Sequence, residues 1–128
     1  MRRLTLILVL LPLWALSQES NQDAHEITRI ALYSGSSSEL SNLYNRNFEL
    51  ILFGSSYDYQ NATTALKEFF SEHPSTEFDI LHTGSSEDKS ISYAIGKYKS
   101  EKGEFRVLMR FKNNGEKQEL HKLEFSHQ

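Results

Sequence analysis

Alternating apolar and polar side chains in the C-terminal half constrain the fold of this chain more than any other feature of its sequence. From Thr76 onward the alternation has a period of two, and turns rich in glycine, asparagine or serine interrupt it. Such runs are typical of strands, here predicted over residues 76–85, 90–100, 104–112 and 117–126. Because short turns join antiparallel neighbours, the four strands should form an antiparallel meander.

Three helices are predicted before the meander. The clearest has an apolar stripe with the spacing of one helical face, made of Ala62, Ala65, Leu66, Phe69 and Phe70. Asn61 is predicted to cap this helix and Pro74 to end it. Shorter helices are predicted over residues 22–34 and from Ser37 onward.

Two further strands are predicted between the second and third helices, over residues 47–53 and 57–60. The order of elements is therefore helix, helix, strand, strand, helix and four strands. A run of helices that packs on one face of an antiparallel sheet defines an α+β domain.

The lengths of two turns decide which side chains face the helices, because a one-residue slip moves a whole strand's side chains to the opposite face. A two-residue Asn-Gly turn would place Lys122 and Glu124 in the core, so a three-residue loop is predicted at residues 113–115. The similar segment at residues 101–103 is predicted to form a loop of the same length.

With these loops, the two faces of the meander differ in character. The inner face, toward the helices, is predicted to carry Phe78, Ile80, His82, Tyr93, Ile95, Phe105, Val107, Met109, Phe111, His121, Leu123 and Phe125. The outer face is predicted to carry a stripe of apolar groups on successive strands, namely Leu81, Ala94, Tyr98, Leu108 and Leu120.

The N-terminal segment has the pattern of a cleaved signal peptide over residues 1–17. Arg2 and Arg3 precede an apolar run, and small residues at a suitable spacing precede Gln18. A membrane anchor is the alternative, although the run is shorter than the roughly 20 residues that span a bilayer. Cleavage leaves one domain, residues 18–128, with no stable membrane insertion, in the periplasm of a bacterium or outside the cell.

Composition excludes several classes of function. The chain has no cysteine, so disulfides and thiolate chemistry are excluded. Losing Arg2 and Arg3 would change the formal charge from −3 to −5, and an acidic domain without a basic run is a poor nucleic-acid binder. The sequence contains no phosphate loop, metal-binding motif or nucleophile motif, so no cofactor and no metal are expected.

Four segments carry a resemblance to a known family: "NFELILF" at 47–53, "ALKEFFSEHPSTEFDILHTGSS" at 65–86, "YAIGKYKSEKGEFRVLMRFK" at 93–112 and "LHKLEF" at 120–125. Their pattern resembles a small family of exported bacterial proteins designated domain of unknown function number 4783. The family belongs to the nuclear-transport-factor-two-like, or cystatin-like, superfamily. The resemblance implies a cone-like curved sheet, a possible pocket at the mouth of the cone and often a homodimer.

The pocket that this fold implies would be lined by His82, Tyr93, Met109, Phe111, Phe69 and Phe70. The alternative is that the aromatic groups simply fill the core. The outer-face stripe, Leu81, Ala94, Tyr98, Leu108 and Leu120, is the candidate dimer interface, since apolar patches of this kind commonly mark interfaces. His25 and Glu26, near the N-terminus of the mature chain, are expected to be solvated.

The function expected from the sequence is that of an exported binding or interaction module, without enzymatic activity. Its partner would be a small molecule in the cone or a second copy of the chain. The alternative is a small-molecule enzyme of the proton-transfer or dehydration type, which would use His82 and Tyr93 in the cone.

Overall fold

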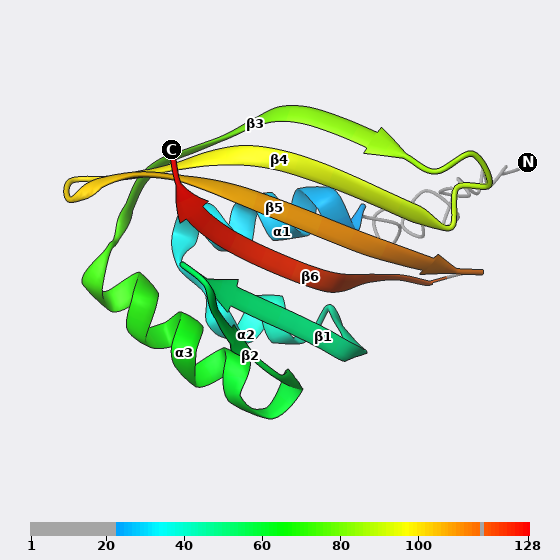
Figure 1. The fold of residues 1–128 in the computed structure, drawn as a ribbon, viewed down its shortest axis with the longest axis horizontal. Coiled ribbons are helices and arrows are strands. Elements are labelled where there is room, and N and C mark those ends of the chain that lie inside the picture. The colour runs from blue at the N-terminus through cyan, green and yellow to red at the C-terminus, as the bar shows by residue number, and fades with distance from the viewer. Residues whose placement is uncertain (1–22, 116) are drawn as a thin grey trace, which may run out of the picture.

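Three helices lie against one face of a curved six-stranded sheet in a computed structural model, which describes residues 23–115 and 117–128 (Figure 1). The helices are α1 (Ala24–Ser34), α2 (Ser37–Ser41) and α3 (Tyr59–Glu72). The strands are β1 (Tyr44–Leu52), β2 (Ser55–Tyr57), β3 (Ser75–Ser85), β4 (Ile91–Ser100), β5 (Gly103–Asn114) and β6 (Lys117–His127). The predicted order of elements and the α+β class are confirmed.

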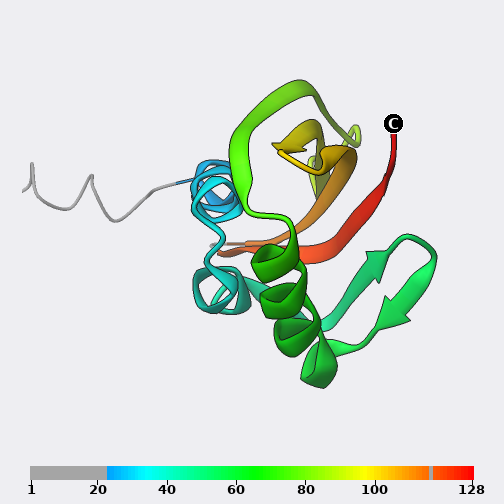
Figure 2. The same cartoon turned by 90° about the vertical axis from the view of Figure 1, so that its left-hand side faces the viewer.

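The sheet has the strand order β2-β1-β6-β5-β4-β3, so the predicted meander from β3 to β6 is present. The strands of the meander pair antiparallel, whereas β1 runs parallel to β6 along the other side of β6. The sheet curves around the helices without closing (Figure 2). In the part of the chain that the structure describes, no helix is long and apolar enough to cross a membrane. The proposed signal peptide, residues 1–17, lies outside the described residues.

Helix α3 begins earlier than the sequence predicted. Its cap is Asp58, in extended backbone geometry, whose Oδ1 accepts a hydrogen bond from the Asn61 amide nitrogen at 3.1 Å. The prediction that Asn61 caps the helix is wrong, because Asn61 lies in the first turn and its own side chain donates to Asp58 at 2.8 Å. Both residue types are good caps, and only the backbone conformation decides between them.

Removing the Asp58 carboxylate should therefore cost more stability than removing the Asn61 amide. Asp58→Ala is expected to lower the free energy of unfolding by about 1 kcal/mol, the usual cost of losing an N-cap. Asn61→Ala should cost less than about half of that, because Asn61 is an exposed residue within the helix. Urea unfolding of both variants measures the difference, and equal losses would contradict the assignment of Asp58 as the cap.

The turn between β4 and β5 is one residue shorter than predicted. Ser100 pairs with Gly103, which leaves two residues between the strands instead of three. As a result Ala94 pairs with Met109 and Tyr98 with Phe105. The predicted faces of β4 are therefore wrong: its even positions point to the helices and its odd positions point outward.

Two of the irregularities in the ladders change the predicted faces, one on β3 and one on β6. On β3, Ile80 pairs with Gly96 but His82 pairs with Ile95, so Leu81 is an extra residue that bulges out of the pairing. On β6 the partners of adjacent β5 residues are Lys122 and Leu120, so His121 is extra. A bulge reverses the side-chain alternation on one side of it.

The bulge on β6 brings Leu120, Leu123 and Phe125 to the inner face together, although their positions do not share one parity. The loop predicted at residues 113–115 is wrong as well, because Asn114 pairs directly with Lys117. Leu120 is fully buried opposite Phe111, so the prediction that it lies on the outer face is wrong. The turn sets the face of Leu120, and the bulge brings Leu123 and Phe125 to the same face.

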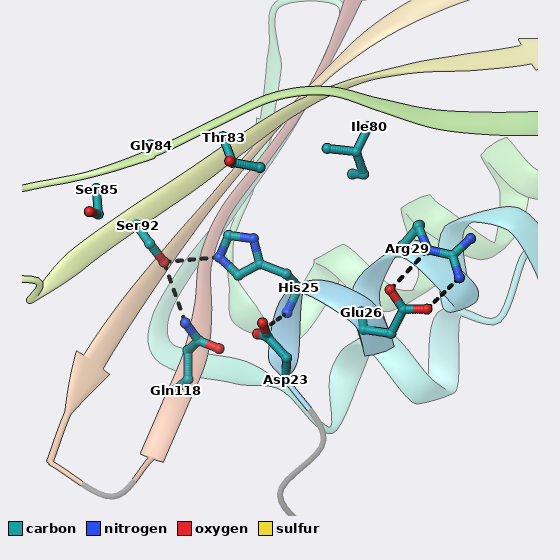
Figure 3. A pocket seen from close by; sticks show the side chains of 10 residues that line it. All are labelled: Asp23, His25, Glu26, Arg29, Ile80, Thr83, Gly84, Ser85, Ser92 and Gln118. Carbon is teal, nitrogen blue, oxygen red and sulfur yellow. Dashed lines mark hydrogen bonds and ion pairs between the residues drawn. The ribbon is translucent and has the colours of Figure 1, made fainter.

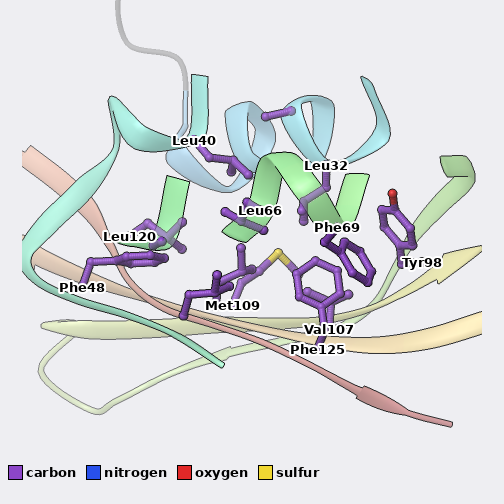
Figure 4. Close-up of a cluster of buried hydrophobic side chains, with 14 of the residues drawn as sticks. Leu32, Leu40, Phe48, Leu66, Phe69, Tyr98, Val107, Met109, Leu120 and Phe125 are labelled. Carbon is purple, nitrogen blue, oxygen red and sulfur yellow. The ribbon is translucent and has the colours of Figure 1, made fainter. Parts of the chain in front are cut away.

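The core between the helices and the sheet is made of aromatic and aliphatic side chains from nearly every element (Figure 4). The inner positions of β5 are buried as predicted, as are Ala62, Leu66, Phe69 and Phe70 of the α3 stripe. Tyr98 is fully buried and its hydroxyl donates to the carbonyl oxygen of His73 at 2.6 Å. Burial raises the pKa of Tyr98, so this hydroxyl remains a hydrogen-bond donor. The bond ties β4 to the end of α3.

Candidate functional site

A cavity of about 510 Å³ opens between the beginning of α1 and the strands β3, β4 and β6 (Figure 3). Its lining is mostly polar and consists of Asp23, His25, Glu26, Arg29, Ile80, Thr83, Gly84, Ser85, Ser92 and Gln118. The volume is within the range of about 300–1,000 Å³ that is typical of small-molecule sites.

The start of α1 sets the position of His25. Asp23 caps the helix, and its Oδ1 accepts a hydrogen bond from the His25 amide nitrogen at 2.9 Å. The imidazole ring then stacks on Phe111 of β5, with ring centroids 4.1 Å apart and planes inclined by 21°. Phe111 is fully buried, so a residue of the hydrophobic core forms the floor under His25.

His25, Ser92 and Gln118 form a hydrogen-bonded polar row across the site. Nε2 of His25 lies 3.0 Å from Oγ of Ser92, and Nε2 of Gln118 donates to the same oxygen at 3.4 Å. Oε1 of Gln118 accepts from the Ala24 amide at 3.1 Å, which fixes the orientation of the Gln118 amide. Ser92 can therefore accept from Gln118 and donate to His25.

The electrostatics of the cavity leave His25 uncharged at neutral pH. Burial lowers the pKa of His25 below its usual value, and the nearby Asp23 carboxylate opposes this effect without cancelling it. Glu26 and Arg29 form an ion pair in which Nε of Arg29 lies 3.1 Å from Oε1 of Glu26. Arg29 lowers the pKa of Glu26, mainly through this hydrogen bonding.

The predicted pocket residues His82 and Tyr93 lie elsewhere. They are neighbours, with Nε2 of His82 3.4 Å from the Tyr93 hydroxyl, but the bulge at Leu81 and the shorter β4–β5 turn place both on the outer face. Neither lines the cavity described above. The enzymatic alternative required these two side chains inside the cone, and the register does not place them there.

The other predicted pocket residues fill the core. Met109 and Phe111 are fully buried, and Phe69 and Phe70 are 5% and 7% exposed. Of these four, only Phe111 approaches the cavity, through its contact with His25.

The predicted dimer stripe is also changed by the register. Ala94, Tyr98 and Leu120 are buried in the core, so they cannot lie on the outer face. Leu108 remains there, half-buried, and Leu81 is 61% exposed at the bulge. A homodimer through the outer face stays a prediction, and it now depends on Leu81 and Leu108 alone.

The polar row was not predicted from the sequence. His25 was expected to be solvated, Ala94 of the strand that carries Ser92 was predicted to face outward, and neither Ser92 nor Gln118 was singled out. One signal was present: Ser92, Ala94 and Gly96 give β4 small residues at alternate positions, which is typical of a face that other groups cover closely. Among residues 23–115 and 117–128, no group of three or more histidine or acidic side chains is arranged to hold a metal ion.

The helices, the curved sheet and the cavity together define a protein of the cystatin-like, or nuclear-transport-factor-two-like, fold. A domain of unknown function with a cystatin-like fold from Nostoc punctiforme shares 10% identity with this chain. The similarity covers 89% of this chain and 76% of that one, with a TM-score of 0.64. At that identity the likeness shows the fold alone.

The family model for domain of unknown function DUF4783 matches residues 25–126, and the chain belongs to this family. A DUF4783 protein from Bacteroides ovatus is 29% identical, covering 84% of this chain and 96% of that one, with a TM-score of 0.71. One from Bacteroides uniformis is 25% identical over 83% and 98% of the two chains, with a TM-score of 0.74. No curated protein gives a significant match.

Proposed function

We propose that this protein is a binding module that holds a small polar molecule in the cavity beside α1. The polar row carries the proposal: three side chains from α1, β4 and β6 are held in fixed orientations at a cavity of small-molecule size. Oriented polar groups of this kind fix the position of a ligand and give a binding site its specificity. Ile80 and the ring of His25 supply the less polar part of the cavity lining.

Binding without catalysis fits the chemistry of the cavity better than an enzymatic reaction does. A general base must be free to reach the proton that it abstracts from a substrate. The two carboxylates at the cavity are both engaged, Asp23 with the His25 backbone amide and Glu26 with Arg29. Ser92 is 8% exposed and hydrogen-bonded by two neighbours, which orients it but limits its access as a nucleophile.

We further propose that the binding takes place outside the cytoplasm, in the periplasm or in the medium. The N-terminal residues support this proposal through the charged, apolar and small-residue pattern of a signal peptide. The absence of cysteine is consistent with a domain that folds without disulfides after export.

The Ser92 hydroxyl is expected to be required for ligand binding. The test is a titration of ¹⁵N-labelled protein with a fragment set of polyols, amides, amino acids and carboxylic acids at millimolar concentration. Fragments should shift the amide signals of His25, Thr83, Ser92 and Gln118. Ser92→Ala should weaken binding by about tenfold, the value of one or two hydrogen bonds that involve a buried hydroxyl.

Ser126→Ala is the matched control, because Ser126 lies on β6 opposite Arg106 on the outer face, away from the cavity. It should leave the same fragment affinities unchanged. The proposal is wrong if the fragments that bind cluster at another surface, or if the two serine variants bind equally well.

A further inference from the structure

We propose that the cavity selects uncharged, hydroxyl-bearing molecules, and that Asp23 is the residue that excludes anions from it. This inference rests on the proposed binding function, to which it adds a class of ligand. It follows from three observations: the hydrogen bonds already made by the amide groups at the α1 N-terminus, the net charge of the cavity lining and the hydrogen-bonding groups that can still contact a ligand.

The N-terminus of α1 faces the cavity, but the amide groups of its first turn already have hydrogen-bond partners. A helix N-terminus normally attracts anions, because its first amide groups lack partners within the helix. In α1 the Asp23 carboxylate accepts from His25 at 2.9 Å, and the Asp23 carbonyl accepts from Glu26 at 3.0 Å and Ile27 at 3.1 Å. The Ala24 amide donates to Gln118 at 3.1 Å. The amide groups of the first three helical residues are therefore satisfied, and the Ile27 bond is the first regular bond of the helix.

The charges that line the cavity also disfavour an anion. They are the carboxylates of Asp23 and Glu26 and the guanidinium of Arg29, which give a net charge of −1 with His25 neutral. Two donor groups of Arg29 are held by Glu26, whose carboxylate offsets the Arg29 charge. An incoming phosphate or carboxylate group would therefore meet the Asp23 charge and compete with Glu26 for Arg29.

A cation gains little in the same place, because each carboxylate already has a partner. Asp23 interacts with the amide end of the α1 dipole, which favours a negative charge there, and Glu26 with Arg29. The groups that remain are the hydroxyls of Thr83 and Ser85, together with the capacity that the polar row leaves unused: a second lone pair of Ser92 Oγ, the second N–H of the Gln118 amide and Nδ1 of His25. A ligand hydroxyl can both donate to and accept from such groups.

The class of ligand is tested with three probes of one skeleton: D-glucose, which is neutral, glucosamine, which is cationic, and glucose 6-phosphate, which is anionic. The full domain is titrated with each at low ionic strength, and the amide signals of Thr83, Ser85, Ser92 and Gln118 are followed. Glucose and glucosamine should bind within about threefold of each other, and glucose 6-phosphate at least about fivefold more weakly, since charge repulsion is only lightly screened there.

Asp23→Asn should reduce the preference for glucose over glucose 6-phosphate to less than about twofold. Asparagine is also a good helix cap, so the variant removes the charge while keeping α1. Asp58→Asn is the matched control: it removes one negative charge from the cap of α3, outside the cavity, and should leave the preference unchanged. If Asp23→Asn melts at a lower temperature than wild type, Asp23→Ser, another good cap, replaces it.

Different failures have different meanings. Glucose 6-phosphate binding at the cavity as tightly as glucose, or a preference unaltered by Asp23→Asn, overturns the assignment of the ligand class while the proposed binding function stands. Glucosamine binding more than about tenfold tighter than glucose shows a cation site, and also overturns it. If neither the three probes nor the fragments shift the amide signals of the cavity residues, both the proposed binding function and the proposed ligand class are wrong.

Discussion

Leu120→Glu is expected to abolish the folded state, whereas Leu108→Glu should leave the domain folded. Leu120 is fully buried on the inner face of β6, opposite Phe111. Burying an unpaired carboxylate costs several kcal/mol even after relaxation. A domain of this size has a total stability of only about 5–15 kcal/mol, so this loss is comparable to the whole. Leu108 lies on the outer face of β5, where a carboxylate can reach water.

Far-ultraviolet circular dichroism and urea unfolding measure both effects. Leu120→Glu should show no cooperative transition at 25 °C, while Leu108→Glu should unfold cooperatively within about 1 kcal/mol of wild type, as is usual for a partly exposed site. The opposite result, with Leu108→Glu unfolded and Leu120→Glu stable, would show that the strands have the register first predicted from the turns.

Gly96→Ala is expected to be the second most damaging of these substitutions. A methyl group at Gly96 would lie 2.7 Å from the Phe78 ring and 2.8 Å from the backbone oxygen of Asp79. The ring is held by the core and the oxygen belongs to the β3 backbone, so neither can move without disturbing the ladder between β3 and β4. Overpacking of this kind costs about 2–3 kcal/mol, which thermal unfolding would show as a lower melting temperature.

Gly84→Ala is the matched control on the same pair of strands. A methyl group there would also come too close to a neighbour, at 2.5 Å, but that neighbour is the outer end of the Tyr93 ring. Because Tyr93 lies on the outer face, its side chain can rotate away, and the expected loss is below about 1 kcal/mol. Equal losses for the two alanine variants would mean that Phe78 does not pack over Gly96.

The sequence predicted most of the fold because several segments admit only one interpretation. The α3 stripe and the inner positions of β5 each place large apolar groups at one spacing, and a core can use them in only one way. On β4 the pattern is ambiguous, since Tyr93 and Ile95 on one face compete with Ala94 and Tyr98 on the other. The sequence prediction placed the larger pair, Tyr93 and Ile95, toward the helices. In the structure Ala94 and Tyr98 face the helices, because the Phe78 ring occupies the space above Gly96 on the same face.

Turn length and bulges are the reason why the remaining faces could not be predicted. Gly103 suits a loop of two or three residues, and the choice reverses every side chain of β4. The extra residues at Leu81 and His121 carry no local signal, because tertiary packing decides where a ladder takes in an additional residue. A prediction of faces from alternation therefore holds only between one bulge and the next.

The candidate site was missed for a related reason. His25, Ser92 and Gln118 are separated by 67 and 26 positions in the chain and meet only when the sheet has curved around α1. Each is an ordinary polar residue in its own segment, and none belongs to a motif. The small residues of β4 indicate a closely covered face, but the inward direction of Ser92 depends on the length of the β4–β5 turn.

In the proposed binding site Phe111 has two roles, which limit how the ligand preference of this protein could change. The ring belongs to the hydrophobic core and also supports His25, so a substitution there would alter folding and recognition together. Thr83 and Ser85 border the same cavity from exposed positions on β3, where replacement costs little stability. Substitutions that alter the proposed ligand preference should therefore be tolerated more readily on this rim than at the aromatic floor.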